Sequence, residues 1–196
     1  MSESFKGTMY SLFDQVEEKP GLFLRCKSLT ALRDFISGFE WGVYQMQHAC
    51  WQEGRERSFS EFLAWCQHHK GMSGGWFAAL SSRAKNEEAG FDEFYRLLKE
   101  YRSKKPNLRF KLTITKRHRS FSEATGSPSN ACVLEFTRYD GEKCVFLRTK
   151  DVGKPYWYLC AVFDSMRQVP AWLKTCFGID RQEWLKKRRP VGFKNS

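Results

Sequence analysis

The chain has 196 residues, of which 41% are hydrophobic and 16% aromatic, and its formal net charge is +11. This share of bulky apolar residues excludes an intrinsically disordered chain, and the length suffices for one large domain or two small ones. The longest apolar run, residues 156–163, is far shorter than the roughly 20 residues that a helix needs to cross a bilayer, so we expect no membrane span.

The positive charge is concentrated in the second half of the chain. Residues 1–105 carry 15 Lys and Arg against 14 Asp and Glu, net +1, whereas residues 106–196 carry 18 against 8, net +10. The N-terminus has no apolar stretch typical of a signal peptide, and the seven cysteines are scattered without a Cys-x-x-Cys pair. We therefore expect reduced thiols and a cytoplasmic location.

The first half of the chain has the apolar spacing of helices. We expect these helices over residues 10–18, from residue 29 onward, and over 59–69, 76–85 and 89–101. Ser28 stands at the N-cap position of the second helix, and Ser58 with Glu61 fits a capping box for the third. Gly38 and Gly42 lie four residues apart in the second helix, where they either admit a close neighbour or weaken the helix.

The pattern changes after a charged turn at residues 103–107. From Leu108 to Thr115, apolar and polar residues alternate, which predicts a half-buried strand with a basic outer face. Residues 118–131 are polar and contain Gly, Pro and Ser, as expected of a loop.

The remaining elements complete a small sheet and its helices. Asp140-Gly141 predicts a two-residue hairpin turn between strands at 132–139 and 143–149. Residues 156–163 are apolar on both faces, as a central strand would be. The last part of the chain predicts two short helices. The first has Pro170 in its first turn, runs to Cys176 and ends at Gly178, and the second covers residues 181–189 and is capped by Asp180 with Glu183.

Together these elements predict an α+β protein. We expect a helical domain over residues 1–105, followed by a basic, β-rich domain over residues 106–196. The second domain would hold an antiparallel sheet of about four strands with one or two C-terminal helices.

No residue pattern identifies a catalytic or metal site. His48-x-Cys50 and Cys66-x-His68 contain zinc-ligand types, but residues two apart point to nearly opposite sides of a helix. The chain has no G-x-S-x-G elbow and no phosphate-binding glycine loop. We therefore expect no enzyme, no metal site and no cofactor.

Three interpretations fit the basic, aromatic second half. A cationic sheet edge near Tyr139, Tyr156, Trp157 and Tyr158 can hold single-stranded nucleic acid through phosphate contacts and base stacking. Alternatively, Lys and Arg coat an edge strand against aggregation, or they dock an acidic protein whose opposite charge speeds association. The candidates for partner contacts on this face are Arg109, Lys111, Arg117, Arg138 and Arg148.

A further motif begins at Lys19. The segment Lys19-Pro-Gly-Leu-Phe-Leu-Arg-Cys-Lys-Ser-Leu leads into a helix with Gly38-Phe39 at its end, and Trp76 and the acidic, aromatic run 87–100 follow. Over about residues 19–101 this pattern resembles small bacterial immunity proteins of polymorphic toxin systems, which have an R-P-x-M-Y-L-G segment and then a Ser-Leu pair. The chain departs from that segment at Leu22-Phe23, in place of Met-Tyr, and at Arg25, in place of Gly.

The resemblance implies a non-catalytic cytoplasmic protein that neutralises a partner toxin by direct binding, without a cofactor. It transfers no contact residues to this chain. Combined with the charge, it predicts a toxin or effector with an acidic surface as the partner. The alternative is a nucleic-acid-binding accessory protein of a phage or mobile element that uses the same basic half. The sequence leaves open whether residues 120–130 become ordered on binding.

Overall fold

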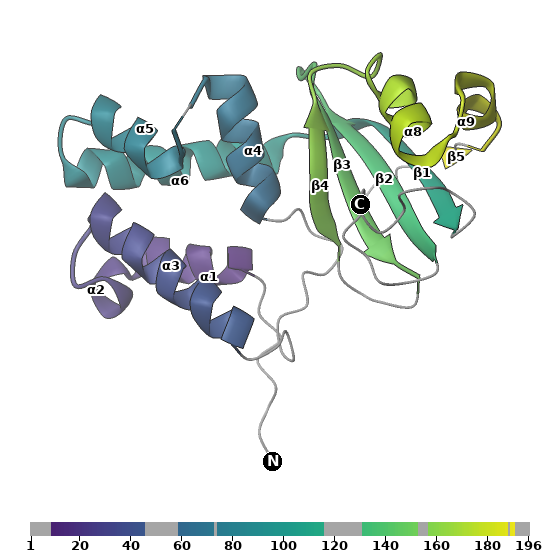
Figure 1. Ribbon diagram of the computed structural model, residues 1–196. Coiled ribbons are helices and arrows are strands. Elements are labelled where there is room, and N and C mark those ends of the chain that lie inside the picture. The colour runs from purple at the N-terminus through teal and green to yellow at the C-terminus, as the bar shows by residue number, and fades with distance from the viewer. Residues whose placement is uncertain are drawn as a thin grey trace. The chain divides into compact units, whose positions relative to one another are not determined.

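The computed structural model of the chain describes residues 9–45, 59–72, 74–115, 131–152, 157–187 and 189–190 (Figure 1). The chain forms two compact units, Met1–Ser103 and Lys104–Ser196, called unit 1 and unit 2 below. Unit 1 is helical and unit 2 contains an antiparallel sheet followed by helices. The predicted α+β class is therefore confirmed.

Six helices make up the described part of unit 1, and aromatic side chains form their core. Phe94 contacts Phe13 and Phe62, with ring centroids 5.7 and 5.6 Å apart. Trp65 and Tyr101 complete this cluster and are fully buried. Aromatic rings bury the largest areas of any side chain, so these contacts account for much of the stability of the unit. The helices are α1 (Met9–Glu18), α2 (Pro20–Phe23), α3 (Leu29–Gln45), α4 (Phe59–Lys70), α5 (Trp76–Arg83) and α6 (Glu87–Ser103).

The first turns of α3 and α6 are joined by hydrogen bonds. The predicted N-cap of α3 is confirmed, because the Ala31 N–H donates to Ser28 Oγ at 3.1 Å. Glu87, at the start of α6, accepts from the Ser28 hydroxyl and from the Thr30 N–H, both at 2.8 Å. The donation from Thr30, and then that from Ser28, lowers the pKa of the Glu87 carboxyl. Ser58, of the predicted capping box, lies outside the described residues.

At two described positions of unit 1, Arg25 and Gly90, the local geometry favours glycine. Arg25 has φ 67°, in the left-handed region, and no other non-glycine residue in the described part of the chain has a positive φ. Close approach occurs at Gly90, where a Cβ would lie 2.8 Å from Leu29 Cδ2. No described atom comes within 4 Å of the corresponding points at Gly38 and Gly42, so these two glycines do not admit a described neighbour.

Unit 2 is built on an antiparallel sheet with the strand order β4-β3-β2-β1-β5. The strands are β1 (Pro106–Thr115), β2 (Ala131–Tyr139), β3 (Val145–Asp151), β4 (Tyr158–Phe163) and the two-residue β5 (Arg189–Pro190). The alternation predicted at residues 108–115 corresponds to β1. The prediction of a central strand at 156–163 is wrong, because β4 pairs with β3 alone among the described strands and lies at the edge. Apolarity on both faces was misleading there, since it also occurs on half-buried edge strands.

The hairpin between β2 and β3 is present, but its connection is longer than predicted. Residues 140–144 link the strands instead of two residues. The Glu142 N–H donates to the Tyr139 carbonyl at 3.1 Å, and Gly141 has φ 77°. This geometry is typical of a turn that needs glycine at its third position. Lys104 forms a 3.0 Å ion pair with the nearly buried Glu142, which anchors the end of the turn.

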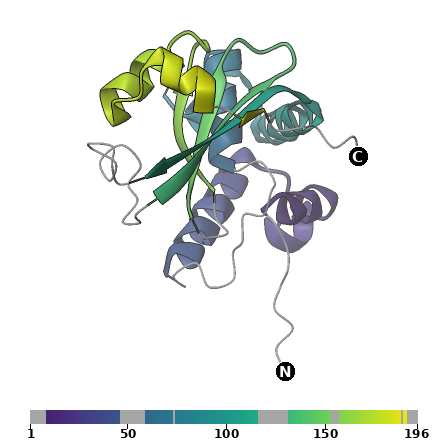
Figure 2. The ribbon, with the colours of Figure 1, turned by 90° about the vertical axis from the view of Figure 1, so that its right-hand side faces the viewer.

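Two helices, α8 (Val169–Phe177) and α9 (Arg181–Lys187), cover one face of the sheet, as Figure 2 shows. The predicted boundary residues hold for α8, where Gly178 adopts a left-handed C-cap. Asp180 caps α9, accepting from the Glu183 N–H at 2.8 Å. The predicted end of the last helix at Arg189 is wrong, because α9 ends at Lys187 and Arg189 pairs with β1 in β5.

Candidate partner-binding site

The two faces of the sheet in unit 2 have different chemistry. Leu112, Leu134 and Leu147 point toward α8 and α9 and form an apolar core with Phe177 and Trp184. Successive residues of a strand point to opposite faces, so the intervening residues share the other face. That face carries the basic side chains of β1 and β3 and a single acidic side chain, Glu135 of β2.

Glu135 lies in the middle of this face between two cations. Lys111 of β1 and Arg148 of β3 are its direct cross-strand neighbours. Arg109 Nη2 donates to Glu135 Oε1 at 2.9 Å, and Arg148 Nη2 donates to the same oxygen. Lys111 Nζ lies 3.3 Å from Oε2. Three cations therefore converge on one carboxylate.

The burial of these side chains decides how strongly they interact. Glu135 is 0% exposed and the Arg148 side chain 5%, whereas those of Arg109 and Lys111 are 28% and 41% exposed. Burial raises the pKa of Glu135, but Arg148 and Arg109 more than offset this, and the pKa lies below its usual range. Glu135 is thus a buried, ionised carboxylate that fixes the positions of the surrounding donors.

Trp157, which directly precedes β4, gathers the same cations. Lys111 Nζ, Arg148 Cζ and Lys150 Nζ lie 5.5, 5.6 and 5.3 Å from the centroid of its ring. Each distance is within the range of a cation–π interaction. We call Arg109, Lys111, Glu135, Arg148, Lys150 and Trp157 the cationic cluster.

The structure brings together three of the five predicted contact residues. Arg109, Lys111 and Arg148 belong to the cationic cluster. Arg138 does not, because alternation places it on the helix-covered face of β2, where its Nε donates to Asn107 Oδ1 at 3.0 Å. Arg117 and the loop at residues 120–130 lie outside the described residues.

Glu135 is the residue of the cluster that the sequence prediction missed. It stands in Cys132-Val-Leu-Glu-Phe, where an acidic residue between apolar ones would ordinarily be taken as solvent-exposed. A signal was nevertheless present, because the flanking strands both carry basic residues in alternation. Lys150 and Trp157 belong to the basic half of the sequence, but nothing in the sequence places them near Lys111 and Arg148.

The cysteines of the described chain are free thiols, mostly shielded from solvent. Burial raises the pKa of Cys66 to about 12, and it raises the pKa values of Cys132 and Cys144 to about 11. Thiols with such pKa values hold little thiolate at neutral pH. Among the residues that the structure describes, no group of His, Cys, Asp and Glu is arranged to hold a metal ion.

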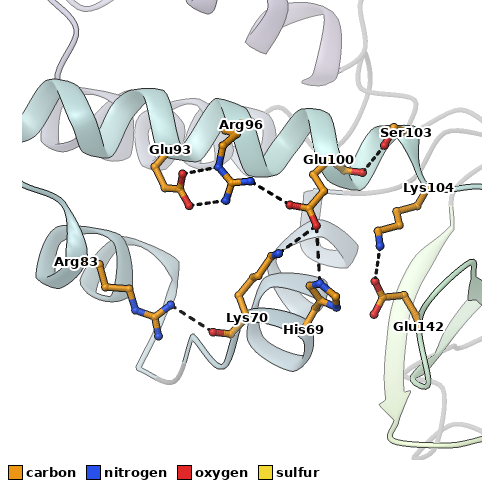
Figure 3. Close-up of polar contacts among 9 residues, drawn as sticks. All are labelled: His69, Lys70, Arg83, Glu93, Arg96, Glu100, Ser103, Lys104 and Glu142. Atoms are coloured by element: carbon orange, nitrogen blue, oxygen red, sulfur yellow. Dashed lines mark hydrogen bonds and ion pairs between the residues drawn. The ribbon is translucent and has the colours of Figure 1, made fainter.

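Unit 1 has a second polar network, which joins α4 to α6 (Figure 3). Arg96 donates to both oxygens of Glu93, at 2.6 and 2.7 Å, and to Glu100 at 3.3 Å. Glu100 in turn accepts from Lys70 at 3.1 Å and lies 3.8 Å from His69. The positive and negative charges of this network balance, so it links α4 to α6 and leaves little net charge for binding a partner.

The chain matches no protein-family model, no curated protein and no solved structure. None of the helices in the described ranges is long and apolar enough to span a membrane. The cationic cluster is therefore the best basis for a functional hypothesis.

Proposed function

We propose that the chain is a non-catalytic binding protein of the immunity type, which neutralises a partner toxin in the cytoplasm by covering an acidic surface. The observation that carries the proposal is the convergence of Arg109, Lys111 and Arg148 on one face of a sheet. Side chains fixed by a buried carboxylate lose less conformational freedom on binding, which favours affinity. Opposite charges on the partner would also speed association.

Two further observations support the proposal. The free thiols of the described residues fit a reducing compartment, and burial raises the pKa values of Cys66, Cys132 and Cys144, which disfavours a thiolate nucleophile at these three positions. Arg25 stands where the resembled motif has glycine, and its left-handed φ of 67° is the conformation that glycine adopts readily. This supports the same local turn in residues 19–39 despite the substitution.

The proposal is tested by a double charge reversal. Lys111→Glu with Lys150→Glu removes two accessible cations from the face, while Lys174→Glu with Lys186→Glu changes the net charge equally at exposed positions on α8 and α9. The toxin to be tested is the product of the adjacent gene, co-expressed with each variant. We expect the first pair to slow association and lose protection from the toxin, and the second pair to protect like the wild type.

Equal protection by both pairs, in proteins that melt at the wild-type temperature, would mean that the cationic cluster is not the toxin-binding face. The double variants must first be shown to fold, by far-UV circular dichroism and thermal melting. Loss of protection by both pairs to the same extent would point to net charge instead of this particular face.

The alternative is nucleic-acid binding, in which the cations of the cluster would contact backbone phosphates. Fluorescence anisotropy with single- and double-stranded DNA and RNA distinguishes the two functions. Affinity for a nucleic acid would fall steeply between about 50 and 200 mM salt as counterions are released. Absence of binding at the lowest salt would leave the protein partner as the proposal.

A further inference from the structure

The cationic cluster holds more positive charge than its own carboxylate neutralises. Four cations share the face, and Glu135 is the only acidic residue that the described strands place there. Lys150 contacts the Trp157 ring and, among the described residues, forms no ion pair with a carboxylate. Like charges gathered at one place repel each other, and an incoming anion relieves that repulsion.

The same face contains buried polar atoms without hydrogen-bond partners. Thr137 is the direct cross-strand neighbour of Arg109 and is 2% exposed. In the described part of the chain neither the Thr137 hydroxyl nor Arg109 Nε has a hydrogen-bond partner. Buried polar groups nearly always have one, so such atoms commonly mark the place of a water molecule or of a ligand group.

Access to the cationic cluster is from the Arg109 and Lys111 side. Their side chains are 28% and 41% exposed, in contrast to Arg148 and Glu135 beneath them. An anion arriving there would meet donors that already contact a carboxylate, since Arg109 and Lys111 both pair with Glu135. The guanidinium fork and the lysine ammonium are thus oriented for planar carboxylate oxygens.

We infer that the cationic cluster is a preformed subsite for one carboxylate side chain of the partner, which binds at Lys111, with Lys150 and Trp157 on one side and Arg109 on the other. This inference rests on the proposed function and specifies the chemical group that the face receives. A nucleobase is less suited to the site, because three cations lie over the ring on which it would have to stack. The resident Glu135 orients the donors, and the incoming carboxylate neutralises the charge that remains.

The subsite can be tested without the partner. The probe is N-acetyl-aspartate amide, which presents an aspartate side chain, and the neutral isostere N-acetyl-asparagine amide is its control. Binding is followed by NMR through the indole N–H of Trp157 and the Nε–H of Arg109, at low ionic strength. Dimethyl phosphate, a mimic of the nucleic-acid backbone, is titrated in parallel.

We expect saturable shifts of both signals with the aspartate probe and none with the asparagine control. Lys111→Gln and Lys150→Gln should each weaken the affinity by roughly tenfold, the effect of losing one charge-assisted contact. Lys174→Gln, which removes a charge from the outer surface of α8, should leave the affinity unchanged.

Three results would overturn the inference. These are the absence of saturable shifts, equal weakening by Lys174→Gln, and tighter binding of dimethyl phosphate than of the aspartate probe. The last result would assign the subsite to phosphate. Failure of the proposed function looks different, because the aspartate probe would then bind as expected while Lys111→Glu with Lys150→Glu still protected cells from the toxin.

Discussion

Replacing Glu135 by Gln tests whether the buried carboxylate holds this face of the sheet together. Gln has nearly the same shape and retains one acceptor oxygen, so the change removes the charge and leaves the packing intact. Arg148, whose side chain is 5% exposed, would then remain as a buried cation without its carboxylate. Unit 2 should therefore lose stability, while unit 1 should not change.

The expected size of the effect follows from burial. Breaking a buried ion pair by removing one partner costs about 3–5 kcal/mol. Arg109 and Lys111 are 28% and 41% exposed, so water screens their share and most of the loss comes from Arg148. The amide oxygen of Gln also keeps part of one hydrogen bond. We therefore expect a loss near the lower end, about 3 kcal/mol in the free energy of unfolding.

The assay is amide hydrogen exchange, read separately for β1–β3 and for the helices of unit 1, because two units need not unfold in one step. Glu183→Gln is the matched control. It removes a carboxylate from an exposed i,i+4 pair with Lys187 on α9 and should cost no more than about 0.5 kcal/mol. A loss below about 1 kcal/mol for Glu135→Gln would refute the view that Glu135 is a buried, ionised partner of Arg148.

The remaining predictions concern pH and the backbone of unit 1. The pKa of Glu135 is lowered in the folded protein, so its contribution to stability is present above the ordinary pKa of 4.5 and is lost as pH falls through the folded pKa. The difference in free energy of unfolding between wild type and Glu135→Gln, measured with urea, should therefore narrow below pH 4.5. Arg25→Gly should raise the free energy of unfolding of unit 1 by about 0.5–1 kcal/mol, whereas Arg25→Ala should not, since only glycine tolerates φ 67° without strain; equal effects in thermal melting would contradict this. Gly90→Ala should destabilise unit 1 by about 1 kcal/mol, because the new Cβ would lie 2.8 Å from Leu29 Cδ2 and overpacking outweighs helix propensity. Gly38→Ala should instead stabilise unit 1 by up to about 1 kcal/mol, because no described atom lies within 4 Å of the new Cβ. If urea unfolding showed Gly90→Ala to be more stable than Gly38→Ala, the packing described at Gly90 would be contradicted.

Local patterns in the sequence were sufficient for the fold class and for most helix boundaries. Ser28 and Gly178 mark helix ends through interactions within a few residues, so their chemistry is readable without knowledge of the fold. The position of β4 was not readable in this way. Strand order depends on pairing between distant segments, and an apolar strand such as residues 158–163 satisfies both a central and an edge position.

The candidate site shows the same division between local and distant information. Alternation in β1 correctly placed Arg109 and Lys111 on one face, because the period of a strand is local. Arg138 was assigned to that face from its charge, although its position in β2 belongs to the other. Glu135 becomes significant only when β1 and β3 are aligned on both sides of it, and that alignment is a property of the whole sheet.

The position of Glu135 also affects which misfolded sheets are accessible. If β2 slipped by one residue against its neighbours, every side chain of the strand would exchange faces. Glu135 would then enter the apolar layer beneath α8 and α9, and Leu134 would leave it. An unpaired carboxylate in such a layer costs several kcal/mol, which is a large fraction of the net free energy of unfolding of a small domain. A single acidic residue in the middle strand thus destabilises sheets in which β2 is shifted by one residue. This effect on folding does not depend on a partner.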